Sequence, residues 1–121
     1  MFLNDLFTIQ SEQAEGTQTV FSIRLNGSHP IYGAHFPGSP ITPGVCIVQI
    51  AVDLFSHLQG HVCRLAGAKN VKFLQVIKPD EYGEVSYSLS WELAEEGLYK
   101  VKVMVSAGEM VFAKMSLQIA G

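Results

Sequence analysis

The fold is decided by the segment His35-Phe36-Pro37-Gly38-Ser39-Pro40-Ile41-Thr42-Pro43-Gly44-Val45, which leads directly into an apolar stretch ending at Gln59. Five prolines and glycines in its middle exclude a regular strand or the interior of a helix. We predict that Thr42 caps a helix and that Pro43 takes the first helical position, where its missing N–H costs nothing. Gly60 is a natural stop for that helix.

This predicted helix is apolar almost all the way round, so we expect it to be buried. Its apolar positions are Val45, Cys46, Ile47, Val48, Ile50, Ala51, Val52, Leu54, Phe55 and Leu58. The exceptions form a polar stripe on one face, at i, i+4, i+7 and i+8: Gln49, Asp53, Ser56 and His57. An unpaired buried polar group costs ~1–3 kcal/mol, so the stripe must face water, a ligand or a partner. Three structural alternatives are a local Asp53–His57 pair, contacts with sheet edges and pairing across a dimer.

The composition indicates one globular domain over residues 1–121. Hydrophobic residues make up 48% and charged residues 16%, and the net charge of −3 argues against nucleic acid as a partner. No apolar run reaches the ~18 residues that a membrane helix needs, and the N-terminus lacks the pattern of a secretory signal. Cys46 and Cys63 are too few for a disulfide framework and lack metal-binding spacing. We therefore expect a cytoplasmic protein with no membrane segment and no metal.

Alternating apolar and polar residues predict strands on both sides of the helix. The clearest alternation covers residues 17–26, 84–93, 99–105 and 111–119, and a weaker strand is expected within residues 2–13. Residues 62–77 predict either two short strands or one strand kinked at Gly67. Because the links are short, neighbouring strands must run antiparallel. We predict an α+β domain in which a curved antiparallel sheet wraps one long buried helix.

Basic side chains gather after the helix, and no acidic residue lies between positions 61 and 79. This basic cluster consists of Arg64, Lys69, Lys72 and Lys78. It has two interpretations: a solvated strand edge guarded by lysines, or a docking patch for an acidic partner.

The segment from His35 to Val45 resembles the H-F-P-G-x-P-x-x-P-G-V signature of the bacterial 3-hydroxyacyl-(acyl-carrier-protein) dehydratases, which have the hot-dog fold. The resemblance extends to residues 29–34, the whole helix, and landmarks at 65–67 and 78–80. The fold that the resemblance implies, a helix wrapped by an antiparallel sheet, agrees with the fold predicted from the alternation of apolar and polar residues. The implied reaction removes water from a 3-hydroxyacyl thioester to give the trans-2-enoyl thioester, in fatty-acid or related acyl-chain biosynthesis. No metal or organic cofactor is implied.

The resemblance also assigns roles to individual residues. His35 matches the base that takes the C2 proton, and the backbone N–H of Gly44 matches the donor that polarises the thioester carbonyl. The family places a glutamate or aspartate fourteen residues after the histidine, where this chain has Gln49. One turn later, where the family commonly has glutamine, this chain has Asp53. Glutamine can bind a hydroxyl but cannot donate and regain a proton as a carboxylic acid can.

This departure leaves three functional hypotheses. In the first, the chain is a working dehydratase in which Gln49 or Asp53 holds the leaving hydroxyl. In the second, it is a catalytically impaired homologue that binds acyl chains or completes a heteromeric dehydratase. In the third, it is a hot-dog acyl thioesterase in which Asp53 activates water.

The resembled family builds its active site between two protomers, which implies a homodimer or a higher assembly of dimers. The substrate implied is a thioester on acyl carrier protein, with the basic cluster as its dock. An acyl tunnel along the helix would be lined by Phe36, Val45, Phe55 and Phe73. Plain core packing is the alternative for each phenylalanine.

Overall fold

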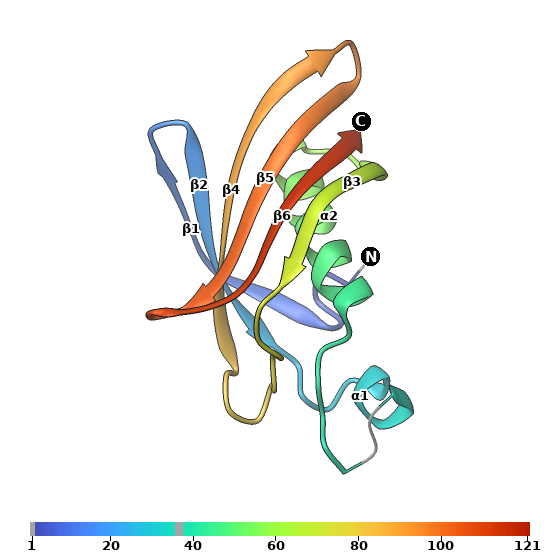
Figure 1. Ribbon diagram of the computed structural model, residues 1–121, viewed down its shortest axis with the longest axis vertical. Helices are drawn as coiled ribbons and strands as arrows, with labels where there is room; N and C mark the ends of the chain where they lie inside the picture. Colours follow the sequence, from blue (N-terminus) through green and yellow to red (C-terminus); the bar gives the residue numbers. More distant parts are fainter. Residues whose placement is uncertain (1, 36–37) are drawn as a thin grey trace.

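The computed structural model describes residues 2–35 and 38–121 and shows one curved antiparallel sheet around a long helix (Figure 1). The strands are ordered β1-β2-β4-β5-β6-β3 across the sheet. The elements along the chain are β1 (Phe7–Glu15), β2 (Gln18–Leu25), α1 (Pro30–His35), α2 (Gly44–Gln59), β3 (Arg64–Phe73), β4 (Glu84–Glu95), β5 (Leu98–Ala107) and β6 (Met110–Ala120). The predicted α+β architecture is confirmed.

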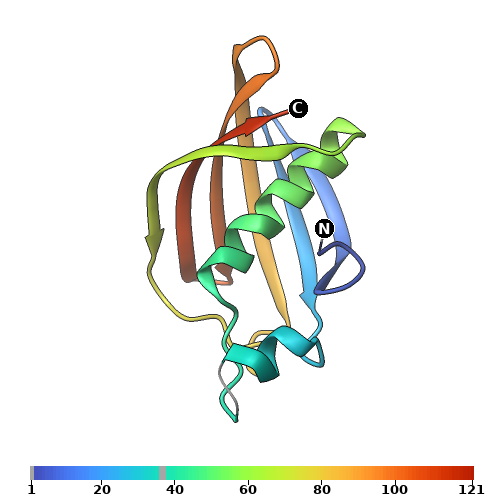
Figure 2. The same ribbon diagram turned by 90° about the vertical axis from the view of Figure 1, so that its right-hand side faces the viewer.

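Helix α2 lies diagonally across the hollow of the sheet, and the core forms between them (Figure 2). The largest fully buried side chains include Phe55 of α2 and Phe21, Tyr87 and Phe112 of the sheet. The Tyr87 hydroxyl donates a hydrogen bond of 2.9 Å to the carbonyl oxygen of Ile47, which fixes the helix against β4. None of the helices in the described part of the chain is long and apolar enough to cross a membrane.

The start of α2 differs from the prediction by one residue. Pro43 is the N-cap, with extended backbone at φ −61° and ψ 146°, and Gly44 is the first helical residue. Thr42 gives no capping bond because it is engaged elsewhere: its hydroxyl lies 3.0 Å from that of Tyr32, and its N–H donates to the Ile77 carbonyl. The predicted stop at Gly60 is confirmed by its left-handed backbone, φ 78°.

Strand β3 is a single strand with irregular register, so the one-strand alternative for residues 62–77 is correct. Its pairing with β6 shifts between Leu65 and Gly67 and again between Lys69 and Lys72. At the second shift Asn70 has a φ of 52°, in the left-handed region. Strands β1 and β3 form the two edges of the sheet. The free side of β3 therefore carries unpaired backbone groups.

Candidate active site

The C-terminus of α1 and the N-terminus of α2 lie at the same end of the molecule (Figure 2). His35 is the last residue of α1, and Gly44 is the first residue of α2. The buried contact between the Tyr32 and Thr42 hydroxyls ties α1 to the segment that precedes α2. Phe36 and the His35 side chain lie outside the described part of the structure.

Gly44 presents a backbone N–H at the start of α2 that has no acceptor within the helix, because the first four helical N–H groups lack one. The helix dipole places partial positive charge at the same point. The Phe73 ring packs directly over this glycine: a Cβ built on Gly44 would meet ring carbons at 2.9 Å. A glycine is therefore what allows the ring to cover the start of the helix.

Gln49 and Asp53 contact each other along the polar stripe. The Gln49 amide nitrogen donates to Asp53 Oδ1 at 2.9 Å. The other carboxylate oxygen, Oδ2, accepts the backbone N–H of Phe2 at 2.6 Å. Asp53 is 1% exposed, whereas Gln49 is partly buried. The carboxylate is thus engaged within the chain, and the carbonyl oxygen and second amide hydrogen of Gln49 are the groups left to contact a ligand.

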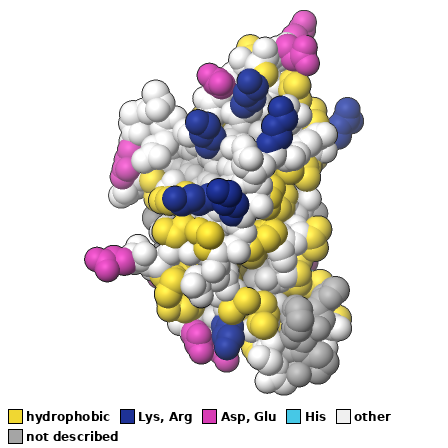
Figure 3. All heavy atoms as spheres, viewed as in Figure 1, with side chains coloured by type: hydrophobic (Ala, Val, Ile, Leu, Met, Phe, Trp, Pro, Cys, Tyr) yellow, Lys and Arg dark blue, Asp and Glu magenta, His cyan; other side chains and the backbone are white. Residues whose placement is uncertain are grey.

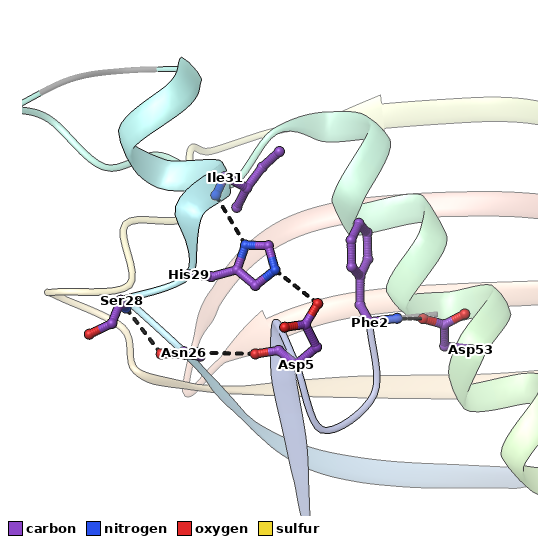
Figure 4. A network of polar contacts seen from close by, with 7 residues as sticks. All are labelled: Phe2, Asp5, Asn26, Ser28, His29, Ile31 and Asp53. Carbon is purple, nitrogen blue, oxygen red and sulfur yellow. Dashed lines mark hydrogen bonds and ion pairs between the residues drawn. The ribbon is translucent and has the colours of Figure 1, made fainter.

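A polar network holds the N-terminal segment that supplies the Phe2 N–H (Figure 4). The N–H of Ile31 donates to Nδ1 of His29, so Nε2 carries the proton and donates to Asp5 Oδ2 at 3.0 Å. Asn26 donates to the Asp5 carbonyl at 3.0 Å. These contacts fix the chain ahead of β1 against the start of α1. No periodicity in the sequence signalled Phe2, Asp5 or His29 as neighbours of the site.

The rest of the polar stripe is also satisfied within the chain, and the local Asp53–His57 pair is wrong. His57 Nε2 lies 2.9 Å from Glu12 Oε1 on β1. Ser56 donates to the Val52 carbonyl and accepts the N–H of Cys63, both at 2.9 Å. The helix carries polar residues here because the edge strand β1 and the segment just before β3 supply their hydrogen-bond partners.

Of the residues predicted to line the acyl tunnel, the three that the structure describes do not lie together. Val45 and Phe73 are near Gly44, with 76% and 49% of their surfaces exposed. Phe55 is fully buried and packs edge-on against Trp91 and Tyr99. It lies eleven residues beyond Gly44, or ~16 Å along the helix axis. Its present surroundings are those of a core residue.

The basic cluster is divided by the fold. Arg64, Lys69 and Lys72 stand on the edge strand β3, while Lys78 lies in the connection to β4. Within the described residues, no group of three or more His, Cys, Asp or Glu side chains could hold a metal ion.

Burial affects the ionisation of groups around the start of α2. It raises the pKa of the Tyr32 hydroxyl, and it also raises the pKa of the Cys46 thiol. Burial raises the pKa of Tyr87 well above its ordinary value. All three groups therefore remain protonated at neutral pH, and the tyrosines serve as hydrogen-bond donors and not as charges.

Comparison with known proteins decides the family. The model of the ApeI-like family, described as ApeI dehydratase, matches residues 10–114. The chain belongs to the ApeI-like dehydratase family. This confirms the resemblance to hot-dog dehydratases.

Two curated relatives of this ApeI-like chain carry the name 3-hydroxyacyl-(acyl-carrier-protein) dehydratase FabZ. The protein from Caldanaerobacter subterraneus subsp. tengcongensis is 29% identical over 113 residues, covering 88% of this chain and 79% of the relative. The protein from Levilactobacillus brevis is 33% identical over 95 residues, covering 71% and 62%.

Solved structures confirm the hot-dog fold of the ApeI-like chain. The dehydratase heterocomplex ApeI:P from Xenorhabdus doucetiae contains a chain with a TM-score of 0.71 at 14% identity, covering 93% of this chain and 96% of that one. A mutant thioesterase from Pseudomonas aeruginosa has a TM-score of 0.63 at 12% identity, covering 94% and 79%. At these identities the likeness concerns the fold alone.

Proposed function

We propose that the chain dehydrates a 3-hydroxyacyl thioester carried by acyl carrier protein to the trans-2-enoyl thioester. One observation carries the proposal: helix α1, which ends at His35, and helix α2, which begins at Gly44, bring these two ends to the same end of a dehydratase-family fold. The carrier-protein substrate is supported by the name of the FabZ relatives. Chemistry on such a substrate would place the protein in the cytoplasm.

The proposed chemistry needs a base, an oxyanion donor and a proton for the leaving group. A neutral His35 imidazole takes the C2 proton, since histidine is the side-chain type that most often acts as a general base near neutral pH. The Gly44 N–H donates to the thioester oxygen as enolate character develops, and such a donor is typically worth ~10²–10³ in rate. The C3–O bond then breaks, the imidazolium returns the proton to the hydroxyl, and water leaves.

Gln49 is the better candidate for holding the leaving hydroxyl. It lies five residues after Gly44, or ~7.5 Å along the helix, whereas Asp53 lies nine residues after it, or ~13.5 Å. Asp53 already accepts two hydrogen bonds. We assign it to positioning, because its Oδ1 accepts a hydrogen bond from the Gln49 amide nitrogen and so fixes the amide, whose oxygen is left to contact a ligand.

The surface beside the site favours a homodimer. Apolar side chains are exposed around the end of β3 and the start of α2: Val45, Phe73, Leu74 and Val76. They adjoin the free edge of β3, whose backbone groups can pair with a second copy. Such a dimer would cover these side chains and place the acyl chain between protomers. The basic cluster is retained as the proposed carrier dock.

The test is mass spectrometry of a 3-hydroxyacyl-carrier-protein pool incubated with purified protein. Wild type should remove one water from the acyl chain, and His35→Ala should not. The matched control is His61→Ala, an exposed histidine after α2, which should retain full activity. Equal turnover by wild type and His35→Ala would refute the proposal.

A second candidate is a partner-dependent dehydratase, favoured by Gln49 standing where the family has a carboxylate. This candidate is supported by the similar fold of a chain in the dehydratase heterocomplex ApeI:P. In that case wild type alone is inert and Gln49→Glu gains activity. The thioesterase hypothesis predicts free acid as product, blocked by Asp53→Asn, but a buried carboxylate with two donors is poorly placed to activate water.

A further inference from the structure

The face of the sheet that points away from α2 carries a polar trough across five strands. Register places outward-facing residues in rows, one of which runs Gln18–Ser90–Lys102–Ser116–Lys69. The next row runs Ser88–Met104–Lys114–Lys72, and Glu92 faces Lys100 in a third. Inward-facing neighbours such as Val103 and Leu117 are buried in the core.

A β-bulge brings the second β3 lysine to this face. Lys69 pairs with Ser116 and Lys72 with Lys114, so three steps on β3 oppose two on β6. In a regular strand, residues three apart point to opposite faces. The extra residue, with Asn70 in the left-handed region, lets both lysines point outward. Bulges re-aim side chains in this way and are characteristic of functional surfaces.

The trough consists of two adjoining hollows of about 600 and 560 Å³. They share Asn70, Ser90, Lys102 and Ser116, so they form one continuous depression. Thr17 and Gln18, at the turn between β1 and β2, border it on one side. The depression is open along the sheet, so it suits a macromolecular surface better than a small ligand.

The charge of the trough is opposite to that of the whole protein. Its lining includes five of the eight basic residues of the chain and one acid, Glu92; the five are Lys69, Lys72, Lys100, Lys102 and Lys114. Figure 3 shows basic side chains gathered over this face and acidic ones at its margins. A protein of net charge −3 therefore concentrates its positive field on one surface.

We propose that this lysine trough docks the acidic surface of a partner protein. The lysines alternate with serine, glutamine and asparagine, which can hydrogen-bond carboxylates while the ammonium groups supply charge complementarity. Nucleic acid is disfavoured because the one aromatic residue of the lining, Trp91, packs edge-on against Phe55 in the core and offers no base a stacking surface. A lipid surface is disfavoured because Met104 is the sole exposed large hydrophobic residue of the lining.

This inference does not rest on the proposed dehydration. Three of the five lysines, Lys100, Lys102 and Lys114, lie outside the basic cluster expected from the sequence. They join Lys69 and Lys72 because β5 and β6 lie between β4 and the edge strand β3. Arg64 and Lys78 do not line the trough.

Fluorescence anisotropy with a labelled poly-glutamate peptide tests the proposal through binding alone. Wild type should bind the peptide at low ionic strength and lose affinity as salt is added. The variant Lys102→Ser/Lys114→Ser should bind about tenfold more weakly. The matched control Arg24→Glu lowers the net charge by the same amount at an exposed position outside both the trough and the basic cluster, and should change affinity less than about twofold. All three proteins should have the same circular dichroism spectrum.

Several outcomes would overturn the proposal. Equal losses of affinity in Lys102→Ser/Lys114→Ser and in Arg24→Glu would show that only net charge matters. Tighter binding of single-stranded DNA or of anionic lipid vesicles than of poly-glutamate would assign the trough to another class of partner. A change in sedimentation of Lys102→Ser/Lys114→Ser would assign it to contacts between copies of this chain.

Discussion

At the scale of single residues, the contacts of Asp53 indicate a structural role for its carboxylate and not a catalytic one. Its carboxylate is buried and accepts hydrogen bonds from the Phe2 N–H and the Gln49 amide. A hydrogen bond to a charged group contributes ~1.5–3 kcal/mol. Asp53 therefore stabilises the N-terminal segment against α2 and fixes the Gln49 side chain at once.

We predict that Asp53→Asn lowers the free energy of unfolding by about 2 kcal/mol, measured by urea denaturation. The matched control is Glu12→Gln, which weakens the half-exposed contact with His57 and should cost less than about 0.5 kcal/mol. The pH profile of any dehydration should keep its shape in Asp53→Asn, because the proposed mechanism assigns the proton transfer to His35. Unchanged stability would show that the Phe2 contact is not held in solution.

Gly44 offers a second prediction at this scale. An added Cβ would lie 2.9 Å from the Phe73 ring, which is half exposed and must move aside. We expect Gly44→Ala to cost about 1–3 kcal/mol of stability by overpacking, measured by urea denaturation. Phe73→Leu in the same chain should recover most of this loss, since the smaller side chain leaves room. If Phe73→Leu recovers no stability, the loss in Gly44→Ala does not come from a clash with the Phe73 ring.

At the scale of elements, sequence patterns predicted the strands and the long helix because both depend on local periodicity. They misplaced the start of α2 by one residue, since the Thr42 hydroxyl prefers the buried Tyr32 contact over a cap. They did not predict α1, whose six residues have no usable period. The bulge at Asn70 was also invisible, because it depends on pairing with β6.

The bulge makes a prediction that involves no change of charge. Asn70→Val places a β-branched residue at φ 52°, where its side chain is strained, so the register should relax and turn Lys72 inward. Asn70→Gly, the control, keeps the left-handed backbone at little cost. Poly-glutamate binding should fall in the valine variant and persist in the glycine variant. Equal binding would show that the bulge does not present Lys72.

At the scale of the whole molecule, sequence and structure agree on the hot-dog fold, and the structure adds contacts around Gln49 and Asp53 that the sequence did not predict. Motif residues could be predicted because the eleven-residue signature from His35 to Val45 is specific. The contacts of Asp53 could not, because Phe2 lies 51 positions away in the chain. Predicting the lysine trough also requires the strand order, which brings lysines from β3, β5 and β6 to one face.

The buried tyrosines predict how stability depends on pH. Burial raises the pKa of Tyr32 and Tyr87, so the folded protein keeps these protons above the ordinary value of 10.0 while the unfolded chain loses them. Stability is therefore unaffected by these groups below pH 10 and falls above it, by up to ~1.4 kcal/mol per pH unit for each tyrosine. Urea denaturation at pH values from about 8 to about 11, a range that brackets the ordinary pKa of tyrosine, measures this slope.

The variant Tyr32→Phe provides the comparison for this slope. Tyr32→Phe should flatten the loss of stability above pH 10, whatever it costs at neutral pH through the Thr42 contact. An unchanged slope in Tyr32→Phe would contradict the burial of that hydroxyl in solution.

The most direct test of the central claim is the fate of the C2 proton. The trans-2-enoyl thioester on acyl carrier protein is incubated with the protein in heavy water, and the product is analysed by mass spectrometry. Hydration through His35 predicts a 3-hydroxyacyl thioester with one deuterium at C2 from wild type, and none from His35→Ala. Free acid as product, or equal deuterium incorporation by both proteins, would contradict the assignment of this chain as a dehydratase that uses His35.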